Sequence, residues 1–327
     1  MSGIATVERP PFREQLLAAQ ARHASLLCVG LDPDPAQFPK AWRNDPARIF
    51  DFCAAIVDAT ADLVCAFKPQ IAYFSAQRAE HQLERLIAHI RVVAPNVPVI
   101  LDAKRGDIGS TAEQYAREAF ERYQADAVTL SPFLGFDSLE PYLRYRGRGL
   151  ILLCRTSNPG GSDLQAQALA ASSERAGATE LLYERIARLA AGEWSERAHH
   201  AGADRPFSLV VGATFPRELA RVRALAPTLP LLVPGVGAQG GDAVATVQAG
   251  HTTAGPVVVS SSRAVLYAAA GTDFATAART AAQQTQALLQ RAQGAKQTQE
   301  TQETQEAAGQ ARTPTPAILP PALVRGA

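Results

Sequence analysis

The sequence predicts a (β/α)8 barrel (TIM barrel), in which eight parallel strands, each followed by a helix, close into a cylinder. Eight short apolar runs alternate with segments of helical periodicity, as in proteins built on parallel sheets. They fall within residues 10–290, close to the roughly 250 residues usual for this fold. A doubly wound sheet shows the same alternation, but no Gly-x-Gly-x-x-Gly follows the first run, and eight regular units favour the barrel.

The eight apolar runs have the length and composition of buried parallel strands. In chain order they are residues 26–31, 64–68, 98–102, 126–130, 149–154, 207–212, 230–234 and 256–260. The segments between them carry apolar residues at helical spacing. In residues 75–93, for example, Leu83, Leu86, Ile87 and Ile90 form one stripe, which predicts a helix that packs on the sheet.

Two regions depart from this repeat. Residues 158–206 form an enlarged segment after the fifth strand, with a helical pattern near 175–191 and a His199-His200 pair that we expect in a solvated loop. Beyond about residue 290 the sequence becomes a repeat of Gln, Thr and Glu and then rich in Pro, without an apolar face to bury. We therefore predict one catalytic domain, residues 1–290, and a disordered tail, residues 291–327.

The composition excludes several classes of partner. The 327 residues include 32 basic and 31 acidic residues, for a net charge of +1, which provides no strong field for nucleic acid or anionic lipid. The N-terminus lacks the apolar core of a signal peptide, and no span is apolar enough to cross a bilayer. The four cysteines lack metal-type spacing and predict buried thiols in a reducing compartment. We expect a cytoplasmic protein with a small-molecule ligand.

The segment Leu-Asp-Ala-Lys-Arg-Gly-Asp-Ile-Gly-Ser-Thr after the third strand carries most of the chemical information. Asp102 and Lys104 are two residues apart, so a continuing strand would project both from one face at its C-terminal end. Asp107 follows in a loop, and Ser110 and Glu113 have the spacing of a capping box at the next helix. Buried charges are costly unless paired, so we favour a functional role over a salt-bridged strand end.

Other strand ends add to this set of polar residues. Barrel enzymes place their chemistry at the C-terminal ends of the strands, and here Asp32 follows strand one and Lys68 ends strand two. Strand seven leads into the glycine-rich residues 234–242, and strand eight leads into Ser-Ser-Ser and Arg263. Backbone N–H groups of a glycine-rich turn that opens a helix, together with a basic side chain, predict a phosphate site between the last two strands.

Taken together, these motifs resemble those of orotidine 5'-phosphate decarboxylases over roughly residues 10–285. The motifs are Asp-x-Lys-x-x-Asp-Ile with Thr111, Phe-Lys-Pro-Gln at 67–70, Pro-Gly-Val-Gly-Ala-Gln-Gly-Gly-Asp at 234–242, and Ser-Ser-Arg. The segment Cys-Arg-Thr-Ser-Asn-Pro-Gly and the long excursion after strand five resemble the longer, type 2 subfamily. The resemblance implies decarboxylation of orotidine 5'-monophosphate (OMP) to uridine 5'-monophosphate (UMP), the final step of de novo pyrimidine biosynthesis, without metal or cofactor.

The resemblance also implies a role for each site residue. Lys104 would protonate C6 and stabilise the charge that develops there, within a catalytic set that also contains Asp102, Lys68 and Asp107. Asp107 would serve the partner subunit's site in a homodimer. The substrate-binding residues implied are Asp32 at the ribose, Ser157 at the pyrimidine, Gln239 and Arg263 at the phosphate, and Ile108 and Thr111 beside Asp107. Two roles stay open for Asp102: destabilising the substrate carboxylate, or keeping Lys104 charged and oriented.

Two other functions fit parts of the pattern. A Mg²⁺-dependent sugar-phosphate decarboxylase or synthase shares the Asp-x-Lys-x-x-Asp core, but it would need further carboxylate or His ligands at strands two to four. The sequence has Lys68 and Ser131-Pro132 at two of these positions. A catalytically silent nucleotide-binding barrel is the third hypothesis, although a protein that only binds would not need the charges of Asp102, Lys104 and Asp107.

Overall fold

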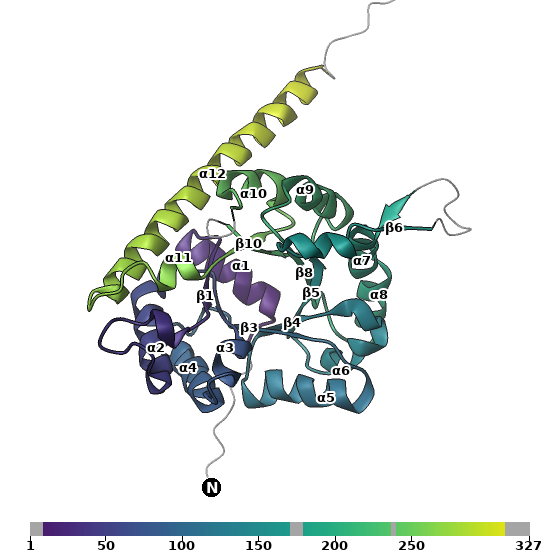
Figure 1. Cartoon of the computed structure of the whole chain (residues 1–327). Coiled ribbons are helices and arrows are strands. Elements are labelled where there is room, and N and C mark those ends of the chain that lie inside the picture. Colours follow the sequence, from purple (N-terminus) through teal and green to yellow (C-terminus); the bar gives the residue numbers. More distant parts are fainter. Residues whose placement is uncertain (1–8, 171–178, 237–239, 311–327) are drawn as a thin grey trace, which may run out of the picture.

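A computed structural model of the chain, which describes residues 9–170, 179–236 and 240–310, contains the predicted barrel (Figure 1). One parallel sheet has the strand order β2-β1-β10-β9-β8-β5-β4-β3. Its strands are β1 (Leu27–Leu31), β2 (Ala66–Pro69), β3 (Ile100–Arg105), β4 (Ala127–Leu130), β5 (Gly149–Arg155), β8 (Phe207–Val211), β9 (Leu231–Pro234) and β10 (Val257–Ser261). The two edge strands meet at the bridges Phe67–Val99 and Gln70–Asp102. All eight predicted strands are confirmed.

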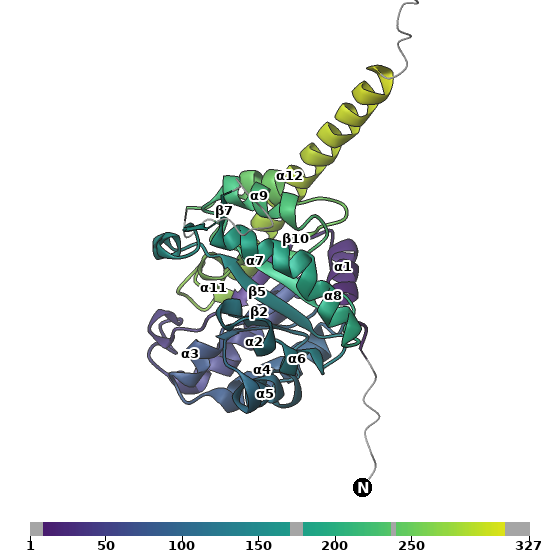
Figure 2. The ribbon, with the colours of Figure 1, turned by 90° about the vertical axis from the view of Figure 1, so that its right-hand side faces the viewer.

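Helices surround the sheet, and the first of them, α1 (Phe12–His23), closes the N-terminal end of the barrel (Figure 2). The helices are α1 (Phe12–His23), α2 (Ile49–Thr60), α3 (Ile71–Ser75), α4 (Glu80–Val93), α5 (Gly109–Arg117), α6 (Glu140–Leu143), α7 (Leu182–Ala191), α8 (Glu193–His200), α9 (Pro216–Leu225), α10 (Ala243–Gly250), α11 (Arg263–Leu266) and α12 (Phe274–Gln310). Short 3-10 turns cover Pro35–Gln37, Pro46–Arg48, Pro132–Leu134, Phe136–Ser138 and Pro159–Asp163, and a π turn covers Glu118–Arg122.

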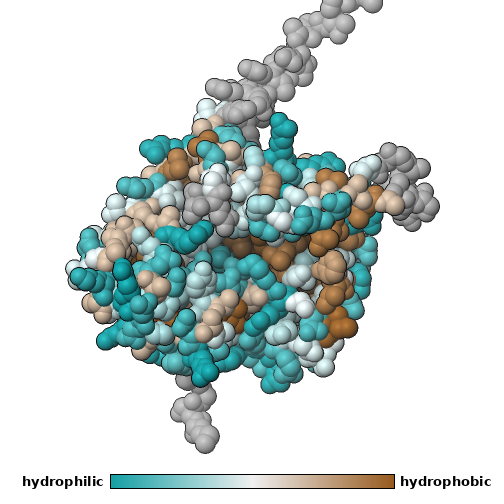
Figure 3. Space-filling model, viewed as in Figure 1, coloured by the Kyte–Doolittle hydropathy of each residue, from teal (hydrophilic) through white to brown (hydrophobic). Residues whose placement is uncertain are grey.

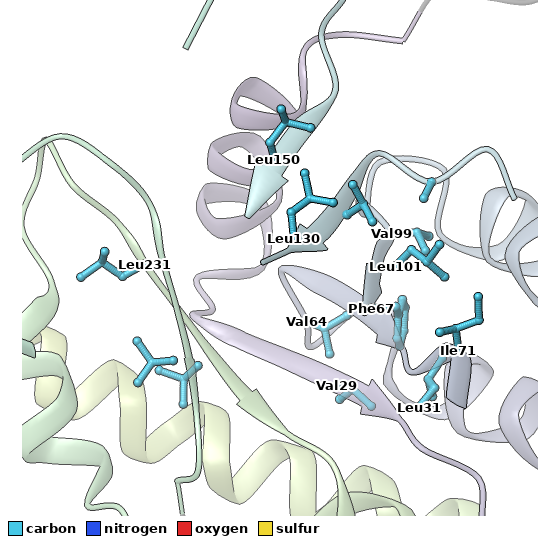
Figure 4. Packing of buried hydrophobic residues seen from close by; sticks show 14 of the residues in the cluster. Val29, Leu31, Val64, Phe67, Ile71, Val99, Leu101, Leu130, Leu150 and Leu231 are labelled. Carbon is cyan, nitrogen blue, oxygen red and sulfur yellow. The ribbon is translucent and has the colours of Figure 1, made fainter. Parts of the chain in front are cut away.

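The alternation of side chains along the strands divides the core into two layers. Residues such as Val29, Leu101 and Leu231 belong to the larger cluster, which packs between the sheet and its helices (Figure 4). Residues on the other face of the strands, such as Cys28 and Ile100, point into the barrel and pack against α1. Since apolar side chains fill the N-terminal half of the barrel, the polar strand ends are left at the C-terminal end.

The long C-terminal helix corrects the predicted start of the tail. α12 continues through Gln310, so the expected disorder is wrong for residues 291–310. Its packing explains this result: Ala292 is buried, and Lys296 Nζ donates to the carbonyl of Gln248 at 2.6 Å. Gln, Glu and Ala are good helix formers, so the helix also extends beyond the barrel, where it has no core to cover (Figures 1 and 2). Residues 311–327 lie outside the described residues.

Two helix starts also differ from prediction. The helix predicted over residues 75–93 begins only at Glu80, as α4, because the preceding helix α3 ends at Ser75 and Arg78 between them has φ +54°. α5 begins at Gly109, and no side chain caps its first turn, so the capping box expected at Ser110 is wrong. Glu113 instead forms an ion pair at 2.6 Å with Arg144, which directly follows the neighbouring helix α6.

The enlarged segment after β5 contains its own small elements. It holds the antiparallel pair β6 (Ala168–Leu169) and β7 (Glu180–Leu181), followed by α7 and α8. The expected helix near 175–191 begins only at Leu182, and residues 171–178 lie outside the described residues. The His199-His200 pair is exposed as predicted, but it ends a helix rather than lying in a loop.

Two predictions from composition can be compared with the fold. Cys28, Cys53, Cys65 and Cys154 are all buried and free, as predicted. Among the helices in the described residues, none combines the length and apolar character needed to span a bilayer.

Candidate active site

A buried carboxylate shared by two lysines forms the centre of the candidate site. Asp102, on β3, accepts from Lys68 Nζ through Oδ2 at 2.8 Å and from Lys104 Nζ through Oδ1 at 2.6 Å. Lys68 comes from the adjacent strand β2 and is buried, as is Asp102. The side chain of Lys104 is 46 % exposed. The network therefore places one accessible ammonium group beside a fully paired buried ion pair.

An irregularity in β3 produces this convergence. The register of β3 against β4 shifts between Leu101 and Arg105, and Lys104 has a left-handed backbone with φ +48°. Such a φ is uncommon for a residue other than glycine. The prediction that Asp102 and Lys104 meet is confirmed, but the assumed regular strand is wrong, because the bulge redirects the chain after Asp102.

A residue that the sequence analysis missed supports both charged groups. Thr129, on β4, donates its hydroxyl to Asp102 Oδ1 at 2.9 Å. The hydroxyl oxygen of Thr129 in turn accepts from the backbone N–H groups of Ala103 and Lys104, at 3.0 and 2.9 Å. A threonine within a strand is ordinary in composition, so nothing in the sequence distinguished it.

The electrostatics keep the buried pair charged. Burial alone would raise the pKa of Asp102, but Lys68 and then Lys104 outweigh it and hold the pKa well below its usual range. Burial alone would lower the pKa of Lys68, but the charges of Asp102 and Asp32 outweigh it and raise the pKa above its usual value. Opposite charges within a few ångströms have this effect, and they favour the charged forms of Lys68 and Asp102.

Asp32 presents an open acceptor at the same end of the barrel. It directly follows β1, and its Oδ1 is buried with no hydrogen-bond donor among the described residues. Its backbone carbonyl accepts from Tyr267 Oη at 2.8 Å, which fixes the turn. A buried carboxylate oxygen without a donor is costly, and a ligand hydroxyl would satisfy it.

Ser157 lies where β5 ends, against the end of β8. Its carbonyl accepts from Thr214 Oγ1 at 3.0 Å. The neighbouring backbone at Gly212 passes so close that a Cβ there would lie 2.5 Å from Ser157 Cα. Only glycine allows this approach, so Gly212 determines how Ser157 sits at the barrel mouth.

Two glycines in the turn after β9 have a left-handed backbone. Gly235 and Gly240 have φ of +97° and +85°. The turn leads into α10, where Asp242 Oδ1 accepts from Ala245 N at 2.6 Å and caps the helix. Gln239, predicted to contact phosphate, lies outside the described residues. The described part of the turn is suited to an anion, since positive-φ glycines open onto a helix N-terminus.

Arg263 lies on the next strand end around the barrel. It follows β10 as the first residue of α11 and is exposed. In residues 9–170, 179–236 and 240–310, no carboxylate forms an ion pair with it. Its guanidinium group is thus available to a ligand between the ends of β9 and β10, which are paired neighbours.

Asp107, Ile108 and Thr111 do not join the network of their own chain. Asp107 Oδ1 accepts only the adjacent Ile108 N–H, at 2.8 Å, among the hydrogen bonds of the described residues. Ile108 is 52 % exposed, and Thr111 is exposed at the start of α5. The three residues predicted to serve a partner subunit therefore face solvent in a single chain.

Three exposed apolar side chains follow the neighbouring strands β3 and β4. Ile108, in the loop after β3, is 52 % exposed, and Phe133 and Leu134, in the turn after β4, are 75 % and 47 % exposed. On the face shown in Figure 3, the most hydrophobic residues gather on the side of α6 to α8, whereas much of the rest is hydrophilic. Exposed apolar residues that cluster often mark an interface.

A separate cavity of about 580 Å³ opens at the opposite end of the barrel. Arg13 and Phe207, the first residue of β8, are among the residues that line it. None of the charged residues at the strand ends contributes to it. Within the described ranges, no three side chains of His, Cys, Asp or Glu are grouped to hold a metal ion.

The chain is similar to known proteins over most of its length. The profile of the orotidine 5'-phosphate decarboxylase / HUMPS family matches residues 25–281. Orotidine 5'-phosphate decarboxylases of Methylibium petroleiphilum and Paracidovorax citrulli are 67 % and 66 % identical, each over 86 % of this chain and 99 % of the relative. The chain in the solved structure of Leishmania donovani OMP decarboxylase is 36 % identical, with a TM-score of 0.68, over 85 % of this chain and 98 % of that one.

Proposed function

This chain belongs to the orotidine 5'-phosphate decarboxylase family, and on that premise we propose that Lys104 is the residue that protonates its substrate. The reaction is the decarboxylation of OMP to UMP in pyrimidine biosynthesis. The observation that carries the assignment is the position of Lys104 Nζ, accessible yet 2.6 Å from the buried Asp102. An ammonium group held in this way can face charge that develops on a ligand.

The proposed chemistry begins with loss of CO2 from C6 of the pyrimidine. The C6–CO2 bond breaks and its electron pair stays on C6, where the Lys104 ammonium stabilises it and then transfers a proton. Asp102 orients Lys104 through its Oδ1, while Lys68 pairs with the second oxygen of that carboxylate. Because the side chain of Lys104 is half exposed, its ammonium group recovers a proton from solvent after each turnover. Of the two roles considered for Asp102, the geometry favours orientation.

The other strand ends supply a binding group for each part of the nucleotide. The open Oδ1 of Asp32 would accept a ribose hydroxyl. Ser157 would bond the pyrimidine, and Gln239 and Arg263 would hold the phosphate beside the glycine turn. Phosphate binding between the last two strands is frequent in this fold, and the free guanidinium group of Arg263 supports it.

We further propose a homodimer in which each subunit lends Asp107, Ile108 and Thr111 to its partner's site. Two observations support it: among the described residues Asp107 accepts only a local hydrogen bond, and Ile108, Phe133 and Leu134 are exposed. A two-fold axis would place the same surface on itself and bring each Asp107 toward the other subunit. A cytoplasmic location is also proposed, because all four thiols are free.

The alternatives have less support. The two relatives described above, which this chain matches over 99 % of their length, are orotidine 5'-phosphate decarboxylases. A Mg²⁺-dependent sugar-phosphate enzyme would need acidic or His ligands where β2 ends in Lys68 and β4 is followed by Ser131. No observation favours a silent nucleotide-binding barrel.

The test is the loss of OMP absorbance with purified protein in excess EDTA. We expect full turnover for the natural chain and no turnover for Lys104→Ala. UMP binding by the variant should persist, because the residues proposed to bind the phosphate follow other strands. If Lys104→Ala keeps more than a few per cent of kcat, Lys104 is not the acid. If EDTA abolishes turnover of the natural chain, metal-dependent chemistry is the better account.

A further inference from the structure

The hydroxyl of Thr129 uses its whole hydrogen-bonding capacity on the segment that carries the candidate acid. A hydroxyl has one proton to donate and two lone pairs to accept with. The Thr129 oxygen accepts from Ala103 N at 3.0 Å and Lys104 N at 2.9 Å, and it donates to Asp102 Oδ1 at 2.9 Å. The residue is 1 % exposed, so water does not compete for these bonds.

The two accepted bonds replace a missing part of the sheet. β3 and β4 are paired at Leu101 and again at Arg105, with a register shift between them. The N–H groups of Ala103 and Lys104 lie in that gap and donate to the Thr129 side chain. A buried N–H without an acceptor is costly, so the hydroxyl makes the left-handed Lys104 backbone tolerable in this position.

The bond that Thr129 donates fixes the carboxylate that holds the ammonium end of Lys104. Asp102 Oδ1, which receives the Thr129 proton, is also the atom that receives Lys104 Nζ. Because both lone pairs are occupied by N–H groups, the proton of Thr129 has one direction left, toward Asp102. Thr129 therefore bonds both to the backbone N–H of Lys104 and to the carboxylate that accepts from Lys104 Nζ.

We propose that Thr129 is a positioning residue for the decarboxylation, acting through Asp102 and Lys104 without touching the reacting atoms. The inference rests on the proposed role of Lys104. It assigns to β4 a function in the reaction that could not be predicted from its sequence, Ala-Val-Thr-Leu.

Three variants test the proposal. Thr129→Val keeps the shape but removes the hydroxyl, and Thr129→Ser keeps the hydroxyl but removes the methyl group. Thr60→Val is the matched control, because Thr60 is equally buried and donates to Ile56 O at 2.7 Å, on α2. All are compared in kcat, KM for OMP and UMP affinity, at a temperature where each is folded.

For Thr129→Val we expect kcat to fall roughly tenfold or more, as a misplaced acid would cause, with KM and UMP affinity within about threefold of the natural chain. Thr129→Ser should stay within about threefold in kcat, and Thr60→Val should be unaffected. The proposal is overturned if Thr129→Val turns over normally, if Thr129→Ser is as impaired as Thr129→Val, or if Thr60→Val shows an equal loss.

Two further measurements keep the result decisive. If Thr129→Val does not fold, Thr129→Cys replaces it, and the weaker hydrogen bonding of the thiol should still lower kcat roughly tenfold relative to Thr129→Ser. Lys104→Ala is assayed in parallel. An inactive Lys104→Ala beside a fully active Thr129→Val contradicts only the role of Thr129, whereas an active Lys104→Ala contradicts the proposed function itself.

Discussion

Lys68 Nζ lies 2.8 Å from Asp102 Oδ2, and both side chains are buried where β2 and β3 end. Breaking such a pair leaves one charge in an apolar setting without compensation. The pair therefore links stability and function, since the same carboxylate also holds Lys104.

Asp102→Asn should destabilise the protein as well as inactivate it. The amide keeps the size of the side chain but removes the carboxylate that is hydrogen-bonded to the buried Lys68 ammonium, at a cost of about 3–5 kcal/mol. Urea unfolding at pH 7 measures this cost. Asp58→Asn, at an exposed pair with His89, is the control and should change stability by less than about 1 kcal/mol. Equal midpoints for both variants would show that the buried pair does not have this role.

Arg263→Ala should raise KM for OMP strongly and leave the fold intact. The expected loss in kcat/KM is about 2–5 kcal/mol, because a phosphate would lose its charged partner. The nucleoside orotidine, which lacks the phosphate, should be turned over equally by variant and natural chain. Arg22→Ala, on α1 at the other end of the barrel, should change neither substrate's kinetics. An equal loss with orotidine would contradict a phosphate role.

His251 predicts a pH dependence of stability at the α10–α12 contact. Burial, with smaller contributions from Lys296 and Arg223, lowers its pKa to about 4. The unfolded chain takes up this proton near pH 6.5, so this stabilisation is complete above about pH 6.5 and is lost as the pH falls toward 4. The loss should reach at most about 3 kcal/mol.

Urea unfolding of the natural chain and of His251→Gln between pH 7 and 4.5 checks this expectation. The natural chain should lose stability more steeply than the variant, and the exposed His81→Gln control should follow the natural chain. Parallel pH curves for the natural chain and His251→Gln would show that the buried imidazole is not responsible.

Two truncations separate the docked part of α12 from the part beyond it. Removing residues 299–327 should leave Tm and kcat/KM unchanged, because the Gln/Thr/Glu repeat has no apolar stripe with which to pack. Removing residues 289–327 also deletes Leu289 and Ala292, which are 0 % and 2 % exposed, and Tm should fall by several degrees. A fall of that size in the shorter truncation would mean that the distal helix packs on the barrel.

The sequence predicted those features that depend on local pattern. All eight strands were recognised because each is a short apolar run, and Lys68 and Asp102 were recognised because each ends such a run. Thr129 was missed because its role depends on a bulge in the adjacent strand. The length of α12 was missed because the residues that it contacts, Gln248 and His251, are 48 and 42 residues away from their partners in the sequence.

In the proposed homodimer, each active site takes Lys104 from one subunit and Asp107 from the other. Homodimers of Lys104→Ala and of Asp107→Ala should then both be nearly inactive. A mixed dimer would contain one site with both substitutions and one with neither, as two-fold symmetry requires. Random re-association of equal amounts makes half of the dimers mixed, so roughly a quarter of all sites should be intact.

The decisive measurement is OMP consumption after the two inactive variants are mixed under mild dissociation and allowed to re-associate. Subunit exchange is verified separately with a size tag on one variant. Recovery to about a quarter of natural activity is the predicted result. If exchange is complete and no activity returns, Asp107 acts within its own subunit or not at all, and the shared site is contradicted.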